Sequence, residues 1–126
     1  MLEGKTATVS TIVSVHNTAM AVGSGDLDVF ATPMMIALME QAACAVLADV
    51  LESGQTSVGT NIAVQHTVAS PVGMKITATA TITSIDGRNL TFDVAASDES
   101  GEIGRGTHTR VIVDAERFMA KVNAKI

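Results

Sequence analysis

One acidic residue stands in surroundings that do not suit a charge. Glu40 lies in the middle of ATPMMIALMEQAACAVLADVL, residues 31–51, a run that is otherwise nearly all apolar. A carboxylate there loses hydration worth several kcal/mol unless a partner or a reaction compensates for the loss. A carboxylate held in such surroundings can act as a general base or as a nucleophile.

Two further residues could work with this carboxylate. Thr32 precedes Glu40 by eight residues, which is about 12 Å along a helix, with both residues on broadly the same side. Its hydroxyl would stand at the positive end of that helix, where an oxyanion or a thioester oxygen is stabilised. His66, near the end of NIAVQHTVA, could transfer protons. The residue types therefore indicate a Thr32–Glu40–His66 site.

Each of these residues also has a plainer structural interpretation. Thr32 can cap the helix that Pro33 begins, since proline suits the first helical position. Glu40 can pair with a partner at a subunit interface, and His66 can be a packed core histidine. His108, in GTHTR, has no obvious partner in the sequence and is the weaker histidine candidate.

Composition limits the classes of function. The chain of 126 residues is 47% hydrophobic, as expected of one globular domain spanning residues 1–126. Its net charge of −5, with no basic run, argues against nucleic acid as a partner. Metal-ligand spacings, phosphate loops and serine elbows are absent, so we expect neither metal nor cofactor.

The single cysteine and the hydrophobic run bear on location. Cys44 cannot form an intrachain disulfide, which favours a reducing cytoplasm. The N-terminal MLEGKTATVS lacks the apolar stretch of a secretory leader. Glu40, Gln41 and Asp49 argue against a membrane span over residues 31–51. We therefore expect a cytoplasmic protein with no membrane partner.

The order of elements predicts the fold. The run from Thr32 predicts a helix buried on all sides, ended by Gly54. Alternating patterns and turn signals, such as Asp-Gly at residues 86–87, predict strands joined mostly by hairpins. The predicted strands span residues 6–15, 57–69, 74–85, 90–98 and 103–114, followed by a helix over 115–125. One apolar helix and one antiparallel sheet indicate an α+β fold, whose uncovered surfaces favour a homo-oligomer.

Four segments together resemble the fluoroacetyl-CoA thioesterase-like proteins, which have the hotdog fold. They are VFATPMMIALMEQAAC, SVGTNIAVQHTVASPVGMKITATA, IDGRNLTFDVAASD and EIGRGTHTRVIV. The similarity extends over almost the whole chain, from about residue 29 to residue 122. It implies a long central helix wrapped by an antiparallel sheet of about five strands, in a homodimer or a tetramer with the active site near the interface.

The resemblance also implies an activity and a set of residues. The activity is hydrolysis of an acyl-CoA thioester, with coenzyme A as part of the substrate. The family's catalytic threonine, glutamate and histidine match Thr32, Glu40 and His66, with both intervals preserved. Its pocket glycine matches Gly59 in the strand G-T-x-I-x-V-x-H-T. Lys75, Arg88, Arg105 and Arg110 are available for the phosphates of coenzyme A.

The chain departs from the family before the helix. The fluoroacetyl-specific enzyme carries phenylalanines there that form a hydrophobic gate, whereas AVGSGDLDVFATP retains only Phe30. This implies a broader or different short acyl group, with Phe30 still at the substrate. Two other functions stay open: a non-catalytic acyl-CoA binding protein, and an acyl-thioester hydratase or dehydratase. The hydratases, however, carry a histidine-rich Pro-Gly loop that this sequence lacks.

Overall fold

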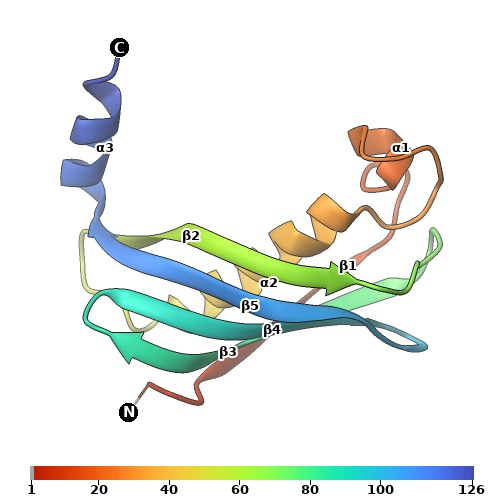
Figure 1. Cartoon of the computed structure of the whole chain (residues 1–126), viewed down its shortest axis with the longest axis horizontal. Coiled ribbons are helices and arrows are strands. Elements are labelled where there is room, and N and C mark those ends of the chain that lie inside the picture. The colour runs from red at the N-terminus through yellow and green to blue at the C-terminus, as the bar shows by residue number, and fades with distance from the viewer. Residues whose placement is uncertain (1) are drawn as a thin grey trace.

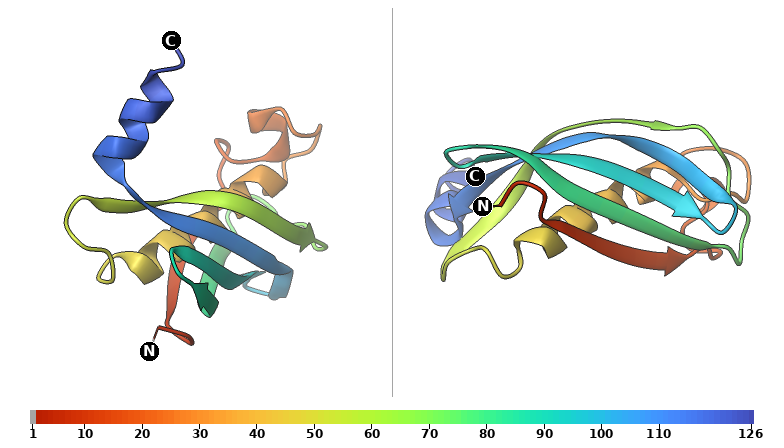
Figure 2. Two further views of the ribbon diagram at one scale, coloured as in Figure 1. Left: turned by 60° about the vertical axis from the view of Figure 1, so that its left-hand side comes forward. Right: turned by 90° about the horizontal axis from the view of Figure 1, so that it is seen from below.

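A five-stranded antiparallel sheet curves around one long helix in the computed structural model, which describes residues 2–126 (Figures 1 and 2). The strand order is β1-β3-β4-β5-β2, so β2 forms one edge of the sheet. This confirms the predicted α+β fold with a central helix. The elements are β1 (Thr6–Ile12), α1 (Ala19–Val22), α2 (Thr32–Leu47), β2 (Gln55–His66), β3 (Lys75–Asp86), β4 (Asn89–Asp98), β5 (Gly101–Asp114) and α3 (Ala115–Asn123).

Small side chains let the sheet approach the helix closely. On β3 every second residue is buried against α2, and two of these are the alanines Ala78 and Ala80. Met35 and Met39 project from α2 into the same core and are fully buried. Flexible methionines fill the irregular space left between alanines, which suits a core almost without aromatic residues.

The long helix is buried on one side only, which corrects the expectation of burial on all sides. Leu38, Met39, Ala42 and Val46 face the sheet. The opposite side includes exposed Gln41, Cys44, Ala45 and Ala48. The run is apolar on this second side as well, so sequence periodicity could not separate the two faces.

The start of α2 also differs from the prediction. Ala31 is the N-cap residue, and it makes no side-chain capping bond. Thr32 is already helical and is followed by Pro33 in the first turn. The interpretation of Thr32 as the N-cap is therefore wrong, and its hydroxyl is left free for another partner.

Other element boundaries shift by a few residues. The first strand ends at Ile12, because the Asn17 amide turns the chain there: it donates to Ile12 O at 3.1 Å and accepts from Ser14 N at 2.8 Å. The helix ends at Leu47 with Ala48 as its C-cap, so Gly54 is not the cap. The second strand ends at His66. Sequence patterns missed the single turn α1.

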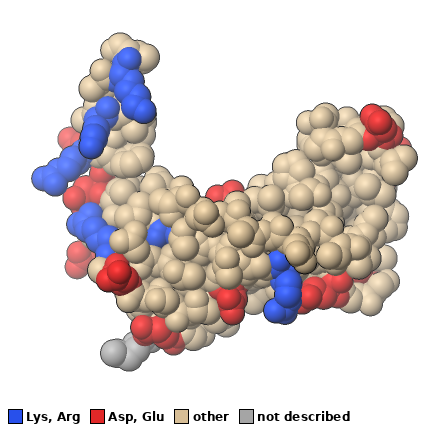
Figure 3. All heavy atoms as spheres, in the orientation of Figure 1, with Lys and Arg blue, Asp and Glu red and all other residues tan. Residues whose placement is uncertain are grey.

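The C-terminal helix α3 projects away from the sheet and concentrates positive charge. Blue Lys and Arg side chains gather on this projecting end of the molecule in Figure 3, and α3 itself carries Arg117 and Lys121. None of its residues is buried. Among residues 2–126, no helix has the length and apolarity needed to cross a membrane.

Candidate active site

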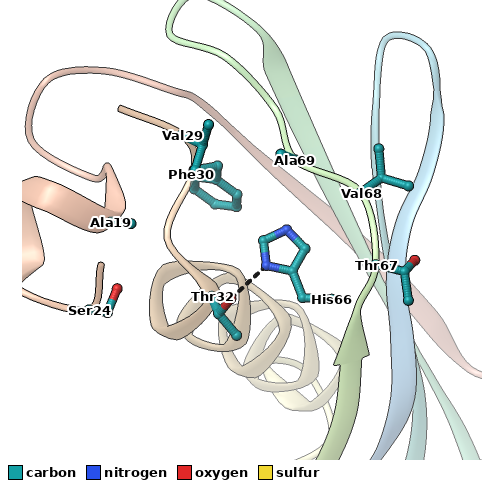
Figure 4. Close-up of a pocket in the computed structure, with 9 residues that line it drawn as sticks. All are labelled: Ala19, Ser24, Val29, Phe30, Thr32, His66, Thr67, Val68 and Ala69. Carbon is teal, nitrogen blue, oxygen red and sulfur yellow. Dashed lines mark hydrogen bonds between the residues drawn. The ribbon is translucent and has the colours of Figure 1, made fainter. Parts of the chain in front are cut away.

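The start of α2 and the end of β2 bring together two of the three predicted site residues. Thr32 Oγ1 lies 2.8 Å from His66 Nδ1, within hydrogen-bond distance (Figure 4). Thr32 is on the first turn of the helix and His66 is the last residue of its strand. The free hydroxyl left by the absence of capping therefore goes to the imidazole. We call these two residues the Thr32–His66 pair.

The other nitrogen of His66 has no partner. His66 Nε2 is the only buried side-chain nitrogen or oxygen among residues 2–126 that makes no hydrogen bond. Buried polar atoms almost always have a partner, so an exception calls for an explanation such as a ligand. Burial of the ring lowers the pKa of His66 below its ordinary 6.5, and the neighbouring main chain of Val68 offsets this only in part. The imidazole is therefore neutral at pH 7.

An open cavity of about 320 Å³ adjoins this pair. Phe30 lines it beside His66, and its ring is almost fully buried (Figure 4). Main-chain bonding fixes this residue, since Phe30 N donates to Ser70 O at 2.9 Å. The remaining lining residues are Ala19, Ser24, Val29, Thr67, Val68 and Ala69. Phe30 thus adjoins two predicted site residues, and its contact with a substrate stays a prediction.

Glu40 lies elsewhere, among a different group of residues. Its Oε2 is 3.7 Å from Arg110 Nη1, and its side chain is 41% exposed against 8% for Arg110. The carboxylate therefore stands at the margin between the buried and exposed sides of α2 and is not enclosed. Its partner is the guanidinium, which is the compensating charge that the sequence analysis required.

Arg110 is held on several sides. Its Nε donates to Ser57 Oγ at 2.8 Å, and its Nη2 donates to Ser57 O at 3.0 Å. Its Nη1 reaches His108 Nε2 at 3.2 Å. Because these bonds enclose the guanidinium inside the fold, Arg110 is not available at the surface for coenzyme A phosphates, contrary to its earlier inclusion among the candidates.

Gly59 faces the same carboxylate across the gap between β2 and α2. A Cβ atom built on Gly59 would lie 3.0 Å from Glu40 Oε2 and 3.2 Å from His108 Cε1. Any larger residue would push against the carboxylate or the imidazole, so glycine leaves room there. A register shift between Gly59 and Asn61 locally distorts β2. Gly59, Glu40 and His108 line a cavity of about 290 Å³ together with Thr60, Asn61 and Ile62.

His108 is the residue that sequence reasoning undervalued. It is 1% exposed, its ring stacks on Phe92 with centroids 6.0 Å apart, and it lines the cavity of Glu40. The signal that could have found it is register: β2 and β5 pair so that Ile62 lies opposite His108 and Gly59 opposite Arg110. We call Glu40, Gly59, His108 and Arg110 the Glu40 cluster.

The two groups remain separate within one chain. The cavity of the Thr32–His66 pair and the cavity of the Glu40 cluster share no lining residue. Each group takes one residue from α2 and one from β2, at different positions along them, and the Glu40 cluster adds His108 and Arg110 from β5. One chain therefore presents a neutral hydroxyl–imidazole pair at one place and a paired carboxylate at another.

Comparisons with known proteins show the fold and the family of the chain. A fluoroacetyl-CoA thioesterase from Streptantibioticus cattleyicolor is 47% identical over 98 residues, which are 78% of this chain and 70% of that protein. A solved structure of the fluoroacetyl-CoA thioesterase FlK superposes with a TM-score of 0.93 at 39% identity, covering 100% of this chain and 98% of the other. A solved structure of a thioesterase superfamily member from Thermus thermophilus superposes with a TM-score of 0.90 at 27% identity. The match covers 97% of this chain and 90% of the other.

The family model described as fluoroacetyl-CoA-specific thioesterase matches residues 3–116. That span contains both site groups and every strand of the sheet. The chain belongs to the fluoroacetyl-CoA-specific thioesterase family.

Proposed function

We propose that this protein hydrolyses a short acyl-CoA thioester to the free acid and coenzyme A. The observation that carries the proposal is the unpartnered Nε2 of His66 beside an open cavity, in a chain of thioesterase ancestry. The relative FlK has been solved in complex with fluoroacetate and CoA. The same class of ligand suits a cavity with one polar edge and one apolar edge.

The neutral imidazole suits the leaving group. When the Thr32 hydroxyl donates to Nδ1, the proton of His66 resides on Nε2, inside the cavity. From there it can be given to the departing thiolate, while Glu40 attacks the carbonyl carbon or deprotonates the water that does. Either route adds one water and releases one carboxylic acid and one thiol. Gly59 leaves space for the thioester carbonyl beside Glu40.

These groups must meet at one carbonyl, and a single chain separates them. Thr32 and Glu40 are eight residues apart on α2, about 12 Å along the axis. Catalytic groups act within about 3 Å of the atoms that they serve. We therefore propose that the site forms between two copies of the chain, with Thr32 and His66 from one subunit and Glu40 and Gly59 from the other.

Two surfaces support a homodimer. The strand β2 has twelve residues and lies at the edge of the sheet, where an unpaired backbone favours another strand. Beside it, α2 exposes the small or apolar residues Cys44, Ala45 and Ala48. A two-fold axis across antiparallel β2 strands would place the Gly59 end of one strand beside the His66 end of the other. That symmetry brings the two groups together.

The acyl group should be short but need not be fluorinated. The segment before α2 contributes Ala19, Ser24 and Val29 to the cavity, all of them small or medium-sized. Phe30 is the one aromatic residue in the lining. A gate built from several phenylalanines has no counterpart in these side chains, so we propose broader selectivity among small acyl groups.

We also propose that the enzyme works in the cytoplasm without a metal or cofactor. Its single cysteine, Cys44, is exposed as a free thiol on α2. A free thiol is usual in a reducing compartment. Hydrolysis as described needs only water and the side chains named above.

The test is a panel of short, branched and aromatic acyl-CoA thioesters, with release of free thiol as the readout. We expect hydrolysis of small acyl groups, and turnover of acetyl-CoA or propionyl-CoA comparable with that of fluoroacetyl-CoA. Tight binding of acyl-CoA without hydrolysis of any member would instead favour a non-catalytic binding protein. Strict preference for fluoroacetyl-CoA would contradict the broader selectivity.

A further inference from the structure

A buried hydrogen-bonded chain runs from the backbone of β2 through two residues of β5 and ends in an ion pair with Glu40. His108 Nδ1 lies 2.7 Å from Asn61 O, and His108 Nε2 lies 3.2 Å from Arg110 Nη1. The same Nη1 is 3.7 Å from Glu40 Oε2. The proposed mechanism uses only Glu40 of these residues, and it leaves the two buried side chains unexplained.

The partners fix which nitrogen of His108 carries the proton. A carbonyl oxygen only accepts, so Nδ1 must donate to Asn61 O. Nε2 is then left with its lone pair and accepts from Arg110 Nη1, which only donates. Burial keeps the pKa of His108 below its ordinary 6.5, and the neighbouring Arg110 charge lowers it further. The ring is therefore a neutral acceptor at pH 7.

His108 Nε2 accepts a hydrogen bond from the one guanidinium nitrogen of Arg110 that Ser57 does not bind. Ser57 holds Nε and Nη2 through its hydroxyl and its carbonyl, whereas Nη1 has only His108 and the Glu40 carboxylate. Stacking on Phe92 fixes the plane of the imidazole. The guanidinium is planar, so Ser57 and His108 together fix the direction of Nη1, which is bonded to His108 and forms the ion pair with Glu40.

We propose that His108 is a positioning residue, which holds Arg110 Nη1 beside Glu40 and so fixes the carboxylate for reaction. This inference rests on the proposed function, because it assigns Glu40 the reactive role. His108 acts through Arg110 and needs no contact with the substrate. Neither residue belongs to the predicted set of Thr32, Glu40 and His66.

Two amide substitutions separate the two ends of the imidazole. A glutamine side chain reaches as far as Nε2 and can offer its oxygen to Arg110, whereas the shorter asparagine reaches only as far as Nδ1 and can replace the bond to Asn61 O. Both variants lose the aromatic ring. If His108 acts through its hydrogen bond to Arg110, His108→Gln retains turnover within about threefold of wild type. His108→Asn and His108→Phe then lose about tenfold in kcat, as expected for one hydrogen bond, with KM changed less than twofold.

A stability control accompanies these variants. Val94→Ala removes a buried side chain on β4, two residues from Phe92, without touching the network. We expect it to lower Tm while kcat of the folded enzyme stays at the wild-type value. Equal losses of kcat in the glutamine and asparagine variants would overturn the proposal, as would an equal loss in Val94→Ala.

A spectroscopic readout keeps this inference distinct from the proposed function. Nitrogen-15 NMR of the wild-type protein should show His108 with a protonated Nδ1 and an unprotonated Nε2. Separate, slowly exchanging Nη1 protons of Arg110 should persist in His108→Gln and collapse in His108→Asn. The opposite tautomer, or identical Arg110 signals in both variants, would refute the role of His108 even in a protein that hydrolyses no acyl-CoA.

Discussion

The Thr32–His66 pair and the Glu40 cluster differ in charge and in how completely their polar atoms are bonded. The pair is neutral and leaves one buried nitrogen without a partner. The cluster is charged, and its buried arginine is bonded on several sides. An unpartnered atom is ready to bind something new, whereas a network of partners holds a reactive group in place. The difference supports our proposal that the pair receives the substrate and the cluster fixes the attacking group.

Removal of the charge from the cluster should have the largest effect. Glu40→Gln keeps the size of the side chain, and its amide oxygen can still accept from Arg110, so we expect little change in Tm. Loss of a positioned base or nucleophile should reduce turnover at least ~100-fold. The measurement is kcat on the best acyl-CoA of the panel. Hydrolysis at the wild-type rate would show that Glu40 is structural, with Arg110 as its only purpose.

His66 should come next, because it is the member of the pair that moves a proton. His66→Ala should lower kcat by about 10- to 100-fold, toward the lower end of the general-acid range. The ring lines an open cavity, and its Nε2 atom makes no hydrogen bond that the substitution would remove. The melting temperature should therefore change little. A large fall in Tm with full activity per folded molecule would mark His66 as a core histidine and favour the acyl-CoA binding protein.

Substitutions of Thr32 should reduce turnover less, and serine and alanine at this position can be compared directly. Thr32→Ser keeps the hydroxyl bonded to His66, whereas Thr32→Ala removes it and should cost about tenfold in turnover, equivalent to about 1.4 kcal/mol. Because Thr32 does not cap α2, the alanine variant should lose less than ~0.5 kcal/mol of unfolding free energy. A loss near that of a true N-cap, about 1 kcal/mol, would show that the hydroxyl stabilises the helix after all.

Acid should lower the free energy of unfolding slightly, through one histidine in each of the two regions. The pKa values of His66 and His108 are lowered from 6.5, mainly by burial. Around and below pH 6.5 the unfolded chain therefore binds more protons than the folded protein, and the free energy of unfolding falls as pH decreases. The slope fades within about one pH unit above 6.5, where these histidines are deprotonated in both states. Denaturant titrations from about pH 8 to about pH 5 measure the slope.

In the double variant His66→Gln/His108→Gln, the free energy of unfolding should fall less steeply as the pH decreases. His16→Gln, at an exposed position, serves as the matched control. An unchanged slope in the double variant would mean that neither imidazole is kept neutral by the fold.

Sequence reasoning selected the candidate site residues whose signals are local. Thr32 and Glu40 stand out because a helix start and a misplaced carboxylate are visible within one run of residues. The family resemblance, the hotdog fold and the thioesterase class are confirmed. The selection of Thr32, Glu40 and His66 for the site stays a prediction, although the structure does place His66 against Thr32.

What sequence reasoning missed depends on contacts between distant segments. His108 matters because β5 pairs with β2, which brings it to Asn61 O from 47 residues away. Arg110 looked like a surface cation because nothing within GTHTR reveals Ser57. The sequence also did not show which side of α2 is exposed, because an exposed apolar surface has the same composition as a core.

The most direct measurement tests whether the two regions combine across a subunit interface. Thr32→Ala and Glu40→Gln subunits carrying different affinity tags are co-expressed, and the mixed dimers are purified. A site shared between subunits restores one intact site per mixed dimer, so the account predicts about half of the wild-type turnover, from two nearly inactive parents. Mixed dimers as inactive as their parents would place Thr32 and Glu40 at one site within a single chain and contradict the account.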